Sequence, residues 1–148
     1  MTTTFFLFYS KFSHKMDKYS IVLMKIALAI VYIWFGALKI FGLSPAGELV
    51  KQTAYWFEPE IFVPILGVFE LIIGLGLLIN RFIPFAIILL LTHMILTLLP
   101  LFILKEDCFD EFPYCPTIVG QYVIKNLVLI SGALVIAGKS NNKQDYLV

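Results

Sequence analysis

Charged side chains are scarce in this 148-residue chain: 14% of its residues are Asp, Glu, Lys or Arg, whereas 60% are hydrophobic. A typical soluble domain has about 25% charged and about 45–50% apolar residues. A soluble domain of this length has too high a surface-to-volume ratio to bury so much apolar surface. The composition therefore excludes a soluble globular enzyme and a disordered chain. It predicts an integral membrane protein.

The sequence also lacks the residues that most cofactors and nucleic acids require. Its formal net charge is +1, so no nucleic-acid partner is indicated. Two cysteines and two histidines form no zinc motif, and His93 has no second intramembrane histidine with which to hold a haem. No flavin or iron–sulfur motif is present. We therefore expect no metal and no intrinsic cofactor.

Long apolar runs dominate what is present. A helix of about 20 residues crosses a hydrocarbon core about 30 Å thick, and four runs reach that length. They are Ile21–Gly42, Ile61–Ile79, Phe82–Leu104 and Ile118–Gly138. The runs are continuous rather than alternating, which excludes a β-barrel. The sequence predicts an all-α, four-helix membrane bundle over residues 19–139.

Basic residues outside these runs indicate the orientation of the bundle. They gather in an N-terminal arm (1–18), at Arg81 in the turn between the second and third spans, and around a C-terminal tail (140–148). The two longer loops are acidic and contain only Lys51 and Lys105 as cations. Because Lys and Arg favour the cytoplasmic side, we predict that both termini are cytoplasmic.

An ionisable residue at membrane depth costs about 2.5–3.5 kcal/mol on insertion scales, so its presence indicates a structural or functional role. Glu70 lies about 13 Å into the second span, and Lys125 lies about 10 Å below the outer surface in the fourth. His93 has a similar depth in the third span, and Gln121 and Asn126 flank Lys125. We expect Glu70 and Lys125 to pair, with His93 within reach. The pair then either fixes helix register or forms a ligand site or proton relay.

Lys39 allows two interpretations. It lies near the outer end of the first span, where its side chain can snorkel to the headgroups. It also shares a helical face with Tyr32 and Gly36, which favours a functional role. In the second span, Gly67 and Gly74 form a small-residue strip that allows close approach of another helix, for which the fourth span is the expected partner.

Cys108 and Cys115 lie seven positions apart in the last outer loop. A disulfide between them is expected if the loop faces an oxidising periplasm. A redox-active pair is the alternative, but such pairs usually have Cys-x-x-Cys spacing and neighbours that lower the thiol pKa, and this loop is acidic.

Three segments resemble a known family. Ile33–Gly47 (IWFGALKIFGLSPAG) and Gly120–Leu129 (GQYVIKNLVL) are similar to motifs of the YkgB-like, reactive chlorine resistance proteins. Phe69–Arg81 (FELIIGLGLLINR) resembles the second helix of the wider DoxX-like superfamily. The resemblance covers about residues 20–138 and departs from the pattern in the cysteine loop and at Asn126, where the family commonly has Asp.

This resemblance implies a multi-pass protein of the bacterial inner membrane, with Lys39, Glu70 and Lys125 at motif positions. DoxX-like members include the small subunit of thiosulfate:quinone oxidoreductase, and others are linked to oxidative-stress defence. Our first hypothesis is therefore a quinone-associated, redox-linked membrane subunit for oxidative-stress defence or electron transfer. The alternative is a small transporter or a structural subunit of a larger membrane complex.

The first hypothesis names specific partners. The quinone carbonyls would bind near Lys125, His93 or Glu70, and a redox partner subunit would supply electrons because the chain has no redox group of its own. The other expected partner is the lipid bilayer. The sequence leaves open whether the chain forms a homo-oligomer.

Overall fold

Four apolar helices form the body of the protein. The computed structural model describes residues 2–45, 47–54 and 56–140. Within them, the helical stretches long and apolar enough to cross a membrane are Phe5–Ile40, Pro59–Leu78, Asn80–Ile103 and Ile118–Lys139. The predicted all-α architecture and its four spans are therefore confirmed. The predicted tail lies outside the described residues, apart from its first residue.

The spans correspond to six helices, because two of them are interrupted. The first two spans are α1 (Thr2–Ile40) and α3 (Pro59–Leu78). The third span is α4 (Ile83–Leu98), which continues as α5 (Pro100–Ile103). The fourth span is α7 (Ile118–Ile124), which continues as α8 (Asn126–Ser140). Pro100 has no backbone N–H to donate, which explains the break after α4. Lys125 occupies the break between α7 and α8.

Shorter elements connect the spans. They are α2 (Gly47–Thr53), the 3₁₀ turn η1 (Asn80–Phe82), α6 (Lys105–Cys108), β1 (Phe109–Glu111) and β2 (Cys115–Pro116). The two strands pair in antiparallel register.

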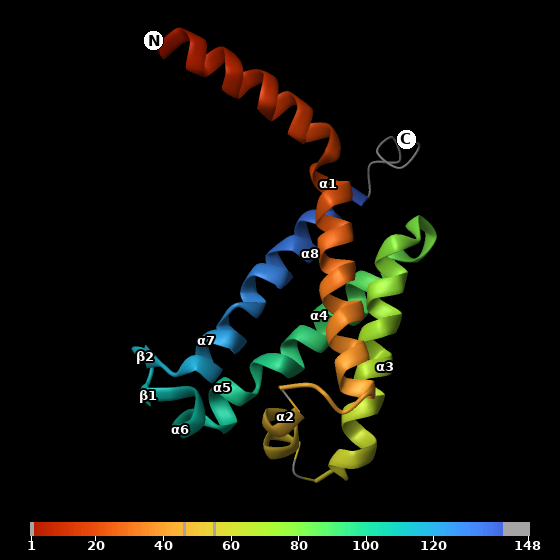
Figure 1. The fold of residues 1–148 in the computed structure, drawn as a ribbon, viewed down its shortest axis with the longest axis vertical. Coiled ribbons are helices and arrows are strands. Elements are labelled where there is room, and N and C mark those ends of the chain that lie inside the picture. The colour runs from red at the N-terminus through yellow and green to blue at the C-terminus, as the bar shows by residue number, and fades with distance from the viewer. Residues whose placement is uncertain (1, 46, 55, 141–148) are drawn as a thin grey trace.

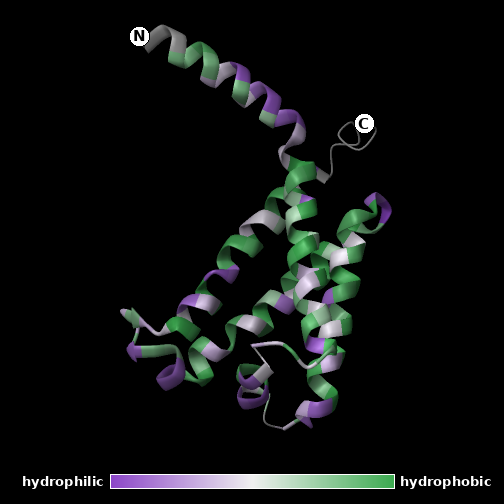
Figure 2. Cartoon of the chain, in the orientation of Figure 1, coloured by the Kyte–Doolittle hydropathy of each residue, from purple (hydrophilic) through white to green (hydrophobic). Residues whose placement is uncertain are grey.

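Both described ends of the chain lie at the same end of the bundle. Figure 1 shows the start of α1, the end of α8 and η1 on one side, with α2, α5, α6 and the strands on the other. Lys25 Nζ donates to Asn80 Oδ1 at 3.0 Å and ties α1 to η1. Polar segments concentrate at the two ends and in the N-terminal part of α1, whereas the spans are mainly apolar (Figure 2). That the terminal side is cytoplasmic remains a prediction.

Glycines bring α1 and α3 into close contact. A Cβ built on Gly36 would lie 2.6 Å from the carbonyl oxygen of Gly67, and the reciprocal distance is also 2.6 Å. A Cβ on Gly74 would lie 2.7 Å from Cγ1 of Ile33. The small-residue strip of the second span therefore faces the first span. The expectation that it faces the fourth span was wrong, because Gly36 supplies the matching small residue.

The apolar core occupies the half of the bundle nearest the termini. It contains Leu28, Ala29 and Tyr32 of α1, Ile73 and Leu77 of α3, Ile83, Ala86, Ile87, Leu90 and Met94 of α4, and Ala133 and Ile136 of α8. Toward the opposite end, α4 and α7 diverge from α1 and α3 (Figure 1). The candidate functional site lies between these diverging helices.

Candidate functional site

A cavity of about 370 Å³ lies between the diverging helices. Its wall is mainly apolar, with Phe35 from α1, Leu66 from α3, Met94 from α4 and Leu129 from α8. Residues of α2 and the segment after it line the cavity at the end opposite the termini; they include Leu49, Val50, Thr53, Trp56 and Phe57. The cavity has the size and apolar lining of a small-molecule site.

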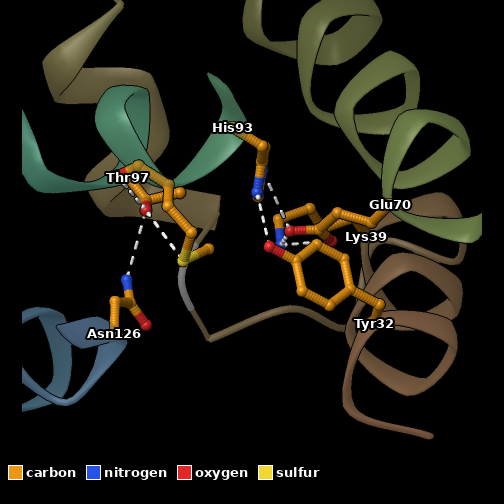
Figure 3. A network of polar contacts seen from close by, with 7 residues as sticks. Tyr32, Lys39, Glu70, His93, Thr97 and Asn126 are labelled. Atoms are coloured by element: carbon orange, nitrogen blue, oxygen red, sulfur yellow. Dashed lines mark hydrogen bonds and ion pairs between the residues drawn. The ribbon is translucent and has the colours of Figure 1, made fainter. Parts of the chain in front are cut away.

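Four polar side chains meet at one wall of this cavity (Figure 3). Lys39 Nζ donates to both oxygens of Glu70, at 2.8 Å and 2.7 Å. Nε2 of His93 lies 3.3 Å from Glu70 Oε1, and its Nδ1 lies 3.5 Å from the Tyr32 hydroxyl. Lys39, Glu70 and His93 are each less than a tenth exposed. With its proton on Nε2, His93 donates to Glu70 and accepts from Tyr32, which gives a continuous four-residue chain.

The local sequence explains why this chain forms. Tyr32, Gly36 and Lys39 are spaced at four and three residues and share one face of α1. Gly67 and Glu70 are likewise three residues apart on α3. Because Gly36 packs directly on Gly67, Lys39 and Glu70 lie one turn away from a backbone contact. The close approach of the two helices thus places the amine against the carboxylate.

A second polar pair lines the cavity apart from the first group. Asn126 Nδ2 donates to Thr97 Oγ1 at 3.3 Å, and Thr97 Oγ1 donates to the Met94 carbonyl at 2.9 Å. Figure 3 shows this pair set apart from Lys39, Glu70 and His93. The cavity therefore has hydrogen-bonding groups on two sides and apolar side chains around the rest of its wall.

The structure separates the predicted site residues into two groups. Lys39, Glu70, His93 and Asn126 line the cavity. Gln121 is exposed and donates to the Pro116 carbonyl at 3.2 Å.

The predicted pairing of Glu70 with Lys125 is wrong. Lys125 is exposed at the junction of α7 and α8, and Glu70 pairs with Lys39 instead. The physical reason is that α3 packs on α1 through its glycines. Tyr32 and Thr97 were not among the predicted site residues. The sequence signal for Tyr32 is its spacing from Lys39, which places both side chains on one face of α1.

The predicted disulfide between Cys108 and Cys115 is also absent, because both are free thiols. The strand register places Cys115 opposite Glu111, whereas Cys108 precedes β1 and is buried. Cys108 Sγ donates to the Pro100 carbonyl at 3.6 Å. Burial, and then the charge of Asp107, raise the pKa of Cys108 above its usual range. These features are typical of a structural thiol rather than a reactive one.

A second cavity, of about 360 Å³, lies between α3, α2 and the loop before α2. Lys39 lines both cavities, and Glu48, Lys51 and Glu60 line the second one. Lys39 therefore lies between the apolar cavity and this charged second cavity, called the vestibule below. No cluster of three or more His, Cys, Asp or Glu side chains suited to a metal ion occurs among the described residues.

The comparisons with known proteins identify the family. No curated protein and no solved structure matches the chain. The family model DoxX matches residues 20–103. This match covers more than half of the chain and includes Lys39, Glu70 and His93. The chain therefore belongs to the DoxX family.

Proposed function

We propose that the apolar cavity binds an amphipathic quinone and that the chain is the quinone-binding subunit of a redox assembly in the bacterial inner membrane. The observation that carries this proposal is the combination of a mainly apolar wall with two separate polar groups. A quinone has carbonyl acceptors on opposite edges of its ring and an apolar tail. Its chemistry therefore matches a wall that is polar on two sides and apolar elsewhere.

Each polar group has a role in this proposal. The Asn126 amide has a second N–H that can donate to one carbonyl, while its first donates to Thr97. When His93 is protonated on both nitrogens, its Nδ1–H would donate to the Tyr32 oxygen, which leaves the Tyr32 O–H available to donate to the other carbonyl. Phe35 and Tyr122 form an edge-to-face pair at 6.4 Å and line the cavity, where they would pack against the ring.

The buried chain of polar residues would also handle protons. Reduction of a quinone to a quinol takes up two electrons and two protons. A partner redox subunit would supply the electrons, since no redox motif is present in the sequence. Protons would pass from the vestibule through Lys39, Glu70 and His93 to Tyr32, because each of these side chains contacts the next. This role in electron transfer or oxidative-stress defence is our preferred function.

Trp56 lines the cavity and provides a direct binding assay. Quinones quench tryptophan fluorescence, and a Trp34→Phe background leaves Trp56 as the sole tryptophan. We expect a short-tailed benzoquinone to quench this signal saturably in purified full-length protein. Asn126→Leu should weaken binding by about tenfold, the upper range for one hydrogen bond.

Lys125→Met is the matched control, since Lys125 neighbours Asn126 in sequence but is exposed. It should leave quinone affinity unchanged. Non-saturable quenching, or equal affinity in all variants, would reject the quinone site. The protein would then be better explained as a small transporter or a structural subunit.

A further inference from the structure

The first helix is longer than a membrane span requires. Its apolar stretch Phe5–Ile40 has 36 residues, which is about 54 Å of helix at 1.5 Å per residue. The hydrocarbon core is only about 30 Å thick. The 20 residues of α1 that end at Ile40 suffice to cross it. The part of α1 before Ile21 therefore extends beyond the span; it contains the predicted N-terminal arm from Thr2 onward and the two residues after it, and is called the arm below.

The arm has an aromatic face and a basic flank. At 100° per residue, six large side chains fall within an arc of about 100°. They are Phe5, Phe8, Tyr9, Phe12, Met16 and Tyr19. Lys11, Lys15 and Lys18 fall together beside this arc, and Ser10, His14 and Asp17 lie roughly opposite it. Phe6 and Leu7 are the large side chains outside the arc. This pattern is typical of a helix that lies in a membrane interface.

The aromatic face has no cover from the rest of the described protein. Phe5, Phe8 and Phe12 are 65%, 70% and 52% exposed. Figure 1 shows the arm leaving the bundle at an angle. An exposed apolar face of this kind marks a surface that binds a partner or a membrane. Its residues continue directly into a membrane-spanning helix, so the nearest apolar phase is the bilayer itself.

We propose that the arm docks on the bilayer surface at the terminal side of the bundle and prefers anionic phospholipids. The aromatic side chains would insert at the level of the acyl–headgroup boundary. Lys11, Lys15 and Lys18 would contact headgroup phosphates from the flank, as cations at the edge of an interfacial helix do. Charge complementarity therefore selects an anionic lipid surface as the occupant. The arm anchors the orientation of α1, independently of any ligand in the cavity.

The test uses the full-length protein in nanodiscs that contain one copy each. An environment-sensitive fluorophore is attached at Phe8→Cys, on the aromatic face, or at Lys11→Cys, on the basic flank. Both variants carry Cys108→Ser and Cys115→Ser so that the probe has a single site. In discs with anionic phosphatidylglycerol, we expect the probe at position 8 to be shielded from aqueous iodide and quenched by lipid-chain quenchers. The probe at position 11 should remain accessible to iodide.

A charge variant tests the lipid preference. Replacement of Lys11, Lys15 and Lys18 by Gln should lower the ratio of docked to free arm about a hundredfold in anionic discs, since each lysine contributes about fivefold. In zwitterionic discs, the same replacement should have little effect. Equal iodide access at positions 8 and 11 would overturn the proposal. Shielding that appears only in discs with two copies would also overturn it, because a second chain would then cover the aromatic face.

Discussion

The contact between α1 and α3 makes a quantitative prediction for Gly67→Ala. A Cβ at this position would lie 2.6 Å from the Gly36 carbonyl oxygen and 2.9 Å from Cγ1 of Ile40. The first obstacle is backbone, so no rotamer change can relieve it. The two helices must move apart, and Lys39 and Glu70 must then lengthen their hydrogen bonds. We expect a loss of about 1–3 kcal/mol in the free energy of unfolding, the usual range for an overpacked core.

Gly138→Ala is the matched control. Gly138 is also helical, but a Cβ there meets nothing within 4 Å. Alanine favours a helix over glycine by roughly 0.5–1 kcal/mol, so this variant should be as stable as the parent or slightly more stable. The opposite signs of the two substitutions separate close packing from helix propensity.

Reversible unfolding of the full-length protein from mild detergent into SDS, followed by circular dichroism, measures both variants. Quinone binding measured with Trp56 reports whether the cavity is also disturbed by Gly67→Ala. A Gly67→Ala protein with parental stability would refute the glycine contact between α1 and α3. It would also remove the physical reason why Lys39, rather than another cation, lies against Glu70.

Three further predictions concern the ion pair, the thiols and the orientation. Lys39→Met alone should cost about 3–5 kcal/mol in the same unfolding assay because it leaves the Glu70 carboxylate buried without its partner, whereas the double variant with Glu70→Gln should recover most of this loss. Equal costs for both variants would contradict the pairing. A maleimide at neutral pH should label Cys115 but not Cys108, whose pKa is raised by burial, and both should react after unfolding. If neither cysteine is labelled without reductant, the two form a disulfide and this prediction is wrong. Reporter fusions within η1 should give cytoplasmic signals and fusions within α2 external ones, and the reverse result would invert the topology.

Much of this architecture follows from the sequence alone, because lipid imposes simple rules. Each backbone polar group must be paired within its segment, so long apolar runs become helices. The high cost of intramembrane charge singles out Glu70 and His93 by their position in the sequence. The free thiol of Cys115 was not predictable in this way, since it depends on the register of two very short strands. Spacing along a chain does not determine that register.

The partner of Glu70 was beyond the sequence for a related reason. Lys39 and Lys125 both lie at a depth that an adjacent carboxylate can reach, so the choice between them depends on which helix packs beside α3. That choice depends on Gly36, whose contact with Gly67 requires both helices to present glycine at the same level. A glycine strip on one helix indicates that a neighbour is close, but not which neighbour it is.

The glycine contacts also bear on why the ion pair exists. A buried pair that only fixes register is the simplest interpretation of Lys39 and Glu70. Two close contacts, between Gly36 and Gly67 and between Gly74 and Ile33, already fix the register of α1 against α3 without any charge. The pair also lies at the wall of an apolar cavity, with His93 on one side and a charged vestibule on the other. A register device requires neither the cavity nor the histidine, so this placement favours a role in binding or proton transfer.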